Sequence, residues 1–271
     1  MSSYSLLLSG GGTAGLVYIG VFRRLRELNI NIQKILSVSV GSICALLYIL
    51  NYSDEDLQSL LLNTDFKTFT NKKIKIYNLL NNYGIDNFNK IKQFIEFLLD
   101  NKGIDKNITF NNFYNLNNFH FQITASNIHK NELTIFDYIN TPNIKIVDAI
   151  KISCCVPFFF IPMKYNGELY VDGGLINNFP IKLLNDDLPN VIGIKILREN
   201  VIKQDIENIL DYSQNILNIL LLNRTDSSTY EEHKGVYIIK VPDNNLLNFH
   251  ITTDQINDLI KLGYDSIQTV S

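Results

Sequence analysis

The sequence has no apolar run of about 18 residues, the length that a membrane-spanning helix needs, and it therefore predicts no transmembrane segment. Its start, Met1-Ser2-Ser3-Tyr4, lacks the basic residues of a signal peptide, and glycines soon interrupt the apolar run that follows. Cysteine is scarce as well. Cys154 and Cys155 are adjacent and Cys44 stands apart, so the chain has no disulfide framework. These absences predict a cytoplasmic protein in a reducing compartment.

An excess of positive charge is also absent, since 24 basic residues stand against 27 acidic ones and the net charge is −3. Such a chain lacks the excess of basic residues that is typical of nucleic-acid-binding proteins, and we expect no nucleic-acid partner. Cysteine, histidine and acidic residues do not gather at the spacing of a metal site, so we expect no metal and no cofactor. Hydrophobic residues at 46% and charged residues at 19% instead indicate a folded globular protein.

Apolar periodicity predicts alternating strands and helices, an α/β arrangement with a mostly parallel central sheet flanked by helices. Ser53 is a predicted N-cap with Asp56 at the capping-box position, and Asn166-Gly167 is typical of a two-residue hairpin turn. The strands are expected over 4–8, 35–38, 163–165, 168–171 and 191–196, and helices over 15–28, 42–50, 53–62, 91–98, 205–222 and 253–268.

The chain contains no clear linker and no internal repeat, so we expect a single domain over residues 1–271. Within it, residues 63–118 are rich in asparagine and predict a variable helical insertion with a lid-like surface. Residues 201–271 predict C-terminal helices and a strand, and the motif-bearing part covers about 4–200.

Two short turns resemble the halves of one active site, because each follows an apolar strand and opens a helix. Ser37-Val38-Ser39-Val40-Gly41 has the pattern of a nucleophile elbow, in which a tight turn lifts the Ser39 hydroxyl clear of the sheet and Ser37 and Gly41 let the backbone pass. The other turn is glycine-rich and offers free N–H groups at a helix start, where an anion is stabilised. Its oxyanion-hole candidates are Gly10, Gly11, Gly12 and Thr13.

A nucleophilic serine also needs a base, and the best candidate is Asp172 at the end of a strand, before Gly173 and Gly174. A carboxylate can accept the proton if the two oxygens lie about 2.6–3.2 Å apart and the site is dry enough to raise its basicity. No histidine lies in a segment that resembles a catalytic loop. The chain has four of them: His120, His129, His233 and His250.

Plainer interpretations exist for each motif alone. Gly10, Gly12 and Gly15 also match the Gly-x-Gly-x-x-Gly pattern of dinucleotide-binding sites. However, the next strand ends without the acidic residue that binds the ribose. The serine turn could be an ordinary helix cap, and Asp172-Gly173 an ordinary turn. The order and spacing of the motifs together favour the active site.

The same motifs resemble the patatin-like phospholipases, whose pattern is a Gly-Gly-Gly-x-Arg-Gly loop, a Gly-x-Ser-x-Gly elbow and an Asp-Gly-Gly or Asp-Gly-Ala turn. The resemblance continues between the motifs over about residues 4–200. It includes Ser53 to Leu57, Ile108 to Phe113, the strand Phe121 to Asn127, Asp148 to Phe160, and Val171 to Pro180 with Asn177 and Asn178.

The resemblance implies a three-layer patatin-like fold and a serine hydrolase of lipid acyl esters, of phospholipase A or lysophospholipase type. It implies that Ser39 attacks the ester carbonyl, that Asp172 accepts its proton, and that the glycine loop, with Val40 after the nucleophile, binds the oxyanion. The implied partners are a lipid or phospholipid ester and, transiently, a membrane or micelle surface. The run Phe158-Phe159-Phe160 belongs either to an acyl pocket or to the core.

Two positions depart from the family pattern. Ala14 replaces the arginine of the oxyanion loop, which removes a fixed positive charge, and Ser37 replaces the first glycine of the elbow, where its Cβ is expected to crowd the turn. These departures predict a slower enzyme. They also motivate the alternative of a catalytically weak or inactive lipid-binding protein with the same fold.

Overall fold

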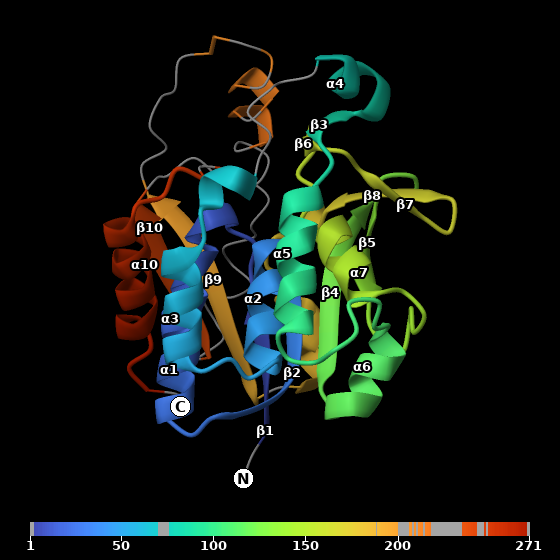
Figure 1. Cartoon of the computed structure of the whole chain (residues 1–271). Coiled ribbons are helices and arrows are strands. Elements are labelled where there is room, and N and C mark those ends of the chain that lie inside the picture. The colour runs from blue at the N-terminus through green and yellow to red at the C-terminus, as the bar shows by residue number, and fades with distance from the viewer. Residues whose placement is uncertain are drawn as a thin grey trace.

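The computed structural model describes residues 3–69, 76–187, 189–199, 206–207, 209, 211–213, 215–217, 235–242, 247 and 249–269. A central sheet of eight strands lies between helices (Figure 1). Its order is β10-β9-β1-β2-β4-β8-β7, and β5 pairs with β4. The strands are β1 (Ser3–Leu8), β2 (Asn31–Val38), β4 (His120–Asn127), β5 (Glu132–Phe136), β7 (Met163–Tyr165), β8 (Glu168–Asp172), β9 (Val191–Glu199) and β10 (Val236–Pro242).

The five strands from β10 to β4 are parallel, and β5, β7 and β8 are antiparallel to their neighbours. In parallel strands both faces are buried, and β1 follows this rule. Leu6 and Leu8 belong to the large core on one face, while Leu7 packs with Leu36 and Leu184 in a smaller core on the other. The sequence prediction of a mostly parallel α/β sheet is confirmed.

Most helices cover the face with the larger core, and η3 packs against β1 and β9. The predicted boundaries are close to those observed, and the Ser53 side chain caps its helix by accepting a hydrogen bond from the Asp56 N–H. The helical elements outside the insertion are η1 (Gly12–Leu16), α1 (Val17–Glu27), α2 (Val40–Ile49), α3 (Asp54–Asn63), α7 (Ile146–Ser153), α8 (Gly174–Asn177), η3 (Ile181–Asp187) and α10 (Thr253–Asp265).

The described residues of the segment 63–118 form helical elements and one strand. Its elements are η2 (Phe66–Phe69), α4 (Ile76–Asn82), β3 (Gly84–Asp86), α5 (Asn89–Asp100) and α6 (Phe110–Asn117). The strand β3 pairs with β6 (Phe158–Phe160), and together with α4 they form one end of the molecule (Figure 1). The insertion is therefore tied to the segment that precedes β8.

The hairpin at Asn166-Gly167 is confirmed, because Tyr165 pairs with Glu168 and both turn residues have positive φ, 49° and 82°. The helix predicted over 205–222 lies mostly outside the described residues. The C-terminal strand is β10, and α10 begins with a capping box between Thr252 and Gln255.

The helix α10 packs against α1 at backbone-to-backbone distance. A Cβ added to Gly263 would lie 1.9 Å from the Val17 carbonyl oxygen, and one added to Gly20 would lie 1.8 Å from that of Ile260.

We therefore expect Gly263→Ala to lower the free energy of unfolding by about 1–3 kcal/mol or more, since the helices must separate. Denaturant titration measures this loss. The matched control is Lys261→Ala on the exposed side of α10, and equal stability of the two variants would contradict the close approach.

Candidate active site

Ser39 lies in a sharp turn between β2 and α2. Its φ of 53° and ψ of −129° are rare for a residue with a side chain. Gly41 allows this turn to pack closely, because a Cβ there would lie 2.9 Å from the carbonyl oxygens of Leu8 and Ser9. A strained strand-to-helix turn that carries a serine is the geometry of a nucleophile elbow.

Asp172 reaches the same point from β8. Val38 and Asp172 both lie beside β4, where they pair with Thr124 and Ala125. The Ser39 Oγ donates a hydrogen bond of 2.5 Å to the Asp172 Oδ2, and the Gly174 N–H donates one of 2.8 Å to the other carboxylate oxygen. The fold thus brings together two residues that lie 133 positions apart in the sequence.

Burial sets the proton affinity of this carboxyl group. Only 7% of Asp172 is exposed, and desolvation raises its pKa from 3.8 to about 6, although the hydrogen bonds from Ser39 and Gly174 act in the opposite direction. A carboxylate with a raised pKa is a stronger base, yet it is still ionised at neutral pH. It can therefore accept a proton from the Ser39 hydroxyl.

Gly173 follows Asp172 and passes β4 closely, since a Cβ at this position would lie 2.6 Å from the Thr124 carbonyl oxygen. Gly174 begins α8 and supplies the N–H that holds the carboxylate. The Gly174 N–H therefore fixes the direction of the Asp172 carboxylate, while Gly173 lets the chain pass close to β4.

The glycine loop lies against the serine. A Cβ at Gly10 would lie 3.1 Å from the Ser39 Cβ and 2.4 Å from the Asn178 Oδ1, and Gly12 has a φ of 55°. The loop therefore needs glycine at Gly10 for space and at Gly12 for conformation. In the part of the chain that the structure describes, the N–H groups of Gly11 and Gly12 have no protein partner. They are available to an anion at the start of η1, and Thr13 continues this turn.

The Val40 N–H is a further available donor. It opens α2, and the first N–H groups of a helix have no partner within the helix. The N–H of Ser39 itself is occupied, because it donates to the Ser153 Oγ at 2.8 Å.

Ser37 is accommodated below the elbow. Its side chain is fully buried, donates a 2.9 Å hydrogen bond to the Gln122 carbonyl oxygen and lies 3.1 Å from the Ser42 Oγ. The Ser42 Oγ is 3.4 Å from the Ser153 Oγ, which completes a row of hydroxyl groups from Ser37 to the Ser39 N–H. The crowding expected from the sequence is thus replaced by hydrogen bonds that hold the turn.

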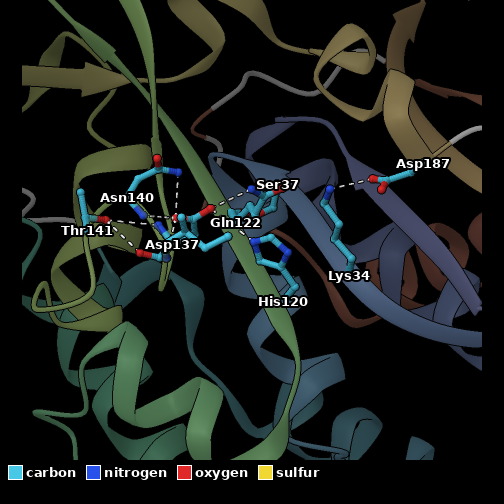
Figure 2. Close-up of polar contacts among 9 residues, drawn as sticks. Lys34, Ser37, His120, Gln122, Asp137, Asn140, Thr141 and Asp187 are labelled. Carbon is cyan, nitrogen blue, oxygen red and sulfur yellow. Dashed lines mark hydrogen bonds and ion pairs between the residues drawn. The ribbon is translucent and has the colours of Figure 1, made fainter.

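This row adjoins a second polar cluster on β4 (Figure 2). The Gln122 side chain donates to the Asp137 carboxylate at 2.8 Å, and the His120 Nε2 lies 3.3 Å from the same oxygen. Asp137 is fully buried, and hydrogen bonds from His120, Asn140 and Gln122 lower its pKa despite the opposing desolvation. The cluster anchors the loop after β5 to β4.

We predict that Ser37→Ala lowers both stability and turnover. Removing the hydroxyl leaves the Ser42 Oγ and the Gln122 carbonyl oxygen without one partner each, which costs about 1–3 kcal/mol. The turnover of a soluble ester should fall several-fold because the elbow is less firmly held. Ser37→Gly, which restores the family residue, should behave like Ser37→Ala. A faster Ser37→Gly enzyme would show instead that the serine crowds the turn.

The described histidines lie away from this site. His120 pairs with Asp137, and neither His129 nor His250 lines the cavity around Ser39. His233 lies outside the described residues. Asp172 is therefore the carboxylate that contacts the Ser39 hydroxyl, and the described histidines do not.

A cavity of about 200 Å³ opens over Ser39, Asp172 and the glycine loop. Its wall is largely apolar and comes from α1, α2, the insertion and the C-terminal segment, as in Ile19, Ile43, Phe69, Phe94, Leu217 and Phe249. Phe160 also lines the cavity, while Phe158 is exposed, so only part of the phenylalanine run belongs to the pocket.

All three cysteines are free and buried.

Three functional candidates were missed by sequence reasoning. Ser153 accepts the hydrogen bond from the Ser39 N–H, Asn178 holds both polar groups of Gly10, and Arg198 donates to the Gly11 carbonyl oxygen. Ser153 and Asn178 lie within segments that carry the family resemblance. Nothing in the sequence around Arg198 points to the loop.

Among the described residues, no group of three or more histidine, cysteine or acidic side chains is arranged to hold a metal ion. A search of the same residues finds no helix long and apolar enough to cross a membrane.

Known proteins include chains that are similar to this one in sequence and in fold. Protein R571 of Acanthamoeba polyphaga mimivirus is 30% identical over 97% of this chain and 92% of its own. The probable lipid hydrolase 463L of Invertebrate iridescent virus 6 is 31% identical over 66% of this chain and 62% of its own. The crystal structure of VipD from Legionella pneumophila superposes with a TM-score of 0.64 over 97% of this chain and 65% of its own, at 17% identity, and shares the fold.

A family model described as patatin-like phospholipase matches residues 6–185, the stretch that holds the glycine loop, the elbow and the Asp172 turn. With that match and the shared fold, the chain belongs to the patatin-like phospholipase family.

Proposed function

We propose that this protein hydrolyses lipid acyl esters, as a phospholipase A or lysophospholipase, through a Ser39–Asp172 dyad. The observation that carries the proposal is the 2.5 Å hydrogen bond from the Ser39 Oγ to the Asp172 Oδ2 at the base of an apolar cavity. Membership of a family of lipid hydrolases supports the same chemistry.

In the first half of the reaction, the Ser39 Oγ attacks the carbonyl carbon of the ester, and its proton passes to Asp172. The carbonyl oxygen becomes an oxyanion, which the N–H groups of Gly11 and Gly12 and that of Val40 stabilise. When the tetrahedral intermediate collapses, the ester C–O bond breaks, and the leaving alkoxide takes the proton from Asp172. An alcohol leaves and the acyl group stays on Ser39.

In the second half, a water molecule gives a proton to Asp172 and attacks the acyl carbon. The bond to the Ser39 Oγ breaks, and Asp172 returns the proton to that oxygen. A fatty acid leaves and the serine is restored. Mutagenesis of oxyanion donors in other hydrolases shows rate losses of about 10²–10³ for each donor, so the glycine loop is expected to matter as much as the base.

The apolar lining of the cavity fits an acyl chain, because a hydrocarbon tail leaves water on entering it. Lys195 and Arg198 on β9 line the same cavity and add positive charge at one side. An amphipathic substrate, with an apolar chain and a polar head, matches both kinds of surface.

The test is labelling with a fluorophosphonate, which reacts with an activated serine whatever the natural substrate. Purified wild-type protein is expected to become labelled at Ser39, as located by peptide mass spectrometry, and Ser39→Ala to remain unlabelled. A folded wild-type protein that takes up no probe and hydrolyses no ester would overturn the proposal, and would favour a lipid-binding protein without catalysis.

We also expect transient contact with a lipid surface through the end of the molecule formed by α4 and β3. Tyr77 and Leu80 are each 73% exposed, and Tyr83 is 63% exposed. These side chains can enter the headgroup region of a membrane.

We predict that Leu80→Asp lowers hydrolysis of vesicle phospholipid about 10-fold but leaves hydrolysis of a monomeric ester unchanged. Leu116→Asp on α6 is the matched control, and an equal loss in both variants would contradict this surface.

A further inference from the structure

The peptide bond between Gly11 and Gly12 is held by an arginine from another part of the chain. The Arg198 Nη2 donates a 2.9 Å hydrogen bond to the Gly11 carbonyl oxygen, which also accepts the Ala14 N–H at 3.2 Å. Arg198 is the penultimate residue of β9 and lines the cavity around Ser39. A positive charge thus lies at the glycine loop, although Ala14 stands where the family has its arginine.

The packing of β9 against the loop explains why this contact forms. Ile196 and Arg198 are two residues apart on a strand, so they share one face. A Cβ on Gly11 would lie 2.7 Å from the Ile196 Cδ1, so the bare glycine backbone rests directly on this face. With Gly11 on Ile196, its carbonyl oxygen comes within reach of the guanidinium group of Arg198.

A second side chain holds the preceding peptide bond in a similar way. The Asn178 Oδ1 accepts the Gly10 N–H at 3.0 Å, and its Nδ2 donates to the Gly10 carbonyl oxygen at 3.3 Å. The carbonyl groups of Gly10 and Gly11 belong to the same peptide planes as the N–H groups of Gly11 and Gly12. The two candidate oxyanion donors are therefore each fixed through the opposite end of their own peptide.

The hydrogen bond from Arg198 has two effects on the Gly12 N–H. A trans peptide is planar, and its C=O and N–H point in opposite directions, so a fixed carbonyl fixes the direction of the N–H. A charged donor on the carbonyl also withdraws electron density from the peptide, and hydrogen bonds in such a chain strengthen one another. The Gly12 N–H becomes a stronger donor in a fixed direction.

The geometry points to Arg198 as a positioning residue of the oxyanion hole, which supplies from β9 the charge that Ala14 does not supply. It acts through the Gly11–Gly12 peptide, and its contribution is largest when negative charge develops on the substrate oxygen. This inference rests on the proposed ester hydrolysis and adds to it a residue that no sequence motif marks.

The experiment compares wild type with Arg198→Met, which keeps the length of the side chain and removes the charge and the donors. On a neutral, soluble p-nitrophenyl ester, kcat should fall about 10- to 100-fold while KM changes little, because the lost interaction belongs to the transition state. A trifluoromethyl ketone adds to the Ser39 Oγ and forms an oxyanion. Its inhibition constant should rise by the same factor as kcat/KM falls.

A second variant separates this role from a purely structural one. In Arg198→Ala, guanidinium chloride at tens of millimolar should restore part of the rate, and sodium chloride at the same concentration should not. Lys261→Met, which removes an equal charge from the exposed side of α10, should leave kcat and the inhibition constant unchanged.

The outcomes distinguish this inference from the proposed function. A wild-type protein that neither reacts with a fluorophosphonate nor hydrolyses the ester would overturn the proposed function. An active wild type together with an Arg198→Met variant of equal kcat and equal inhibition constant would overturn the role of Arg198 alone. A variant that loses only affinity for anionic phospholipid would overturn it too, because Arg198 would then bind the headgroup.

Discussion

Ser39→Ala and Asp172→Asn are each expected to lower ester hydrolysis by at least about 10³-fold. Without Ser39 no acyl-enzyme can form, and without the Asp172 carboxylate the serine proton loses the base to which it is hydrogen-bonded. Because both residues act in the same step, the double variant should be little slower than either single one. The measurement is kcat/KM on a short-chain ester, together with circular dichroism to show that each variant is folded.

Histidine variants provide the control for this assignment. His129→Ala on the surface and His120→Ala beside Asp137 should keep most of the activity, because neither histidine lines the cavity. If His120→Ala were folded and as inactive as Ser39→Ala, the dyad would be wrong, and a triad with histidine would replace it.

The activity should depend on pH through Asp172, whose pKa burial raises to about 6. Only the ionised carboxylate can accept the serine proton. Below about pH 6, kcat/KM should therefore fall about tenfold for each pH unit, and it should be nearly constant from pH 7 to 8. A profile measured on a neutral ester avoids titration of the substrate. A decline centred near pH 4 would mean that Asp172 is solvated or is not the base.

The raised pKa of Asp172 also makes the stability of the folded protein depend on pH. Activity is expected to rise with pH, whereas this contribution to stability falls. A folded-state pKa above the unfolded value means that folding favours the protonated acid, so this contribution to stability is complete below about pH 4 and is lost as the pH rises through about 6. At pH 8 the buried carboxylate should cost on the order of 3 kcal/mol, which Asp172→Asn removes. The inactive variant should thus be the more stable protein at pH 8, and the difference should vanish near pH 4. Denaturant titrations at the two pH values would show this.

Local sequence signals account for the elements that were predicted well. The Asn166-Gly167 turn, the Ser53 cap and the apolar strands depend on neighbouring residues and backbone preferences, which act over a few positions. The pairing of β3 with β6 was not predicted. These strands have three residues each and lie far apart in the sequence, so no periodicity marks them.

Ser37 shows where local reasoning fails. From the sequence, a serine in place of glycine looks like a steric problem below the elbow. In the folded chain its hydroxyl reaches the Gln122 carbonyl oxygen, 85 positions away, and joins Ser42. A side chain can be judged as crowding or supporting only when the atoms packed around it are known.

The sequence by itself determined the α/β alternation of several strands and helices, the two tight turns and the residue types of the proposed dyad, because backbone conformation and motif spacing depend on short segments. The tertiary structure decided the rest. It placed Asp172 against Ser39, enclosed the carboxyl group so that its pKa rises, and brought Arg198 to the Gly11 carbonyl oxygen. These features depend on the register of parallel strands and on burial by distant segments, which no local pattern encodes.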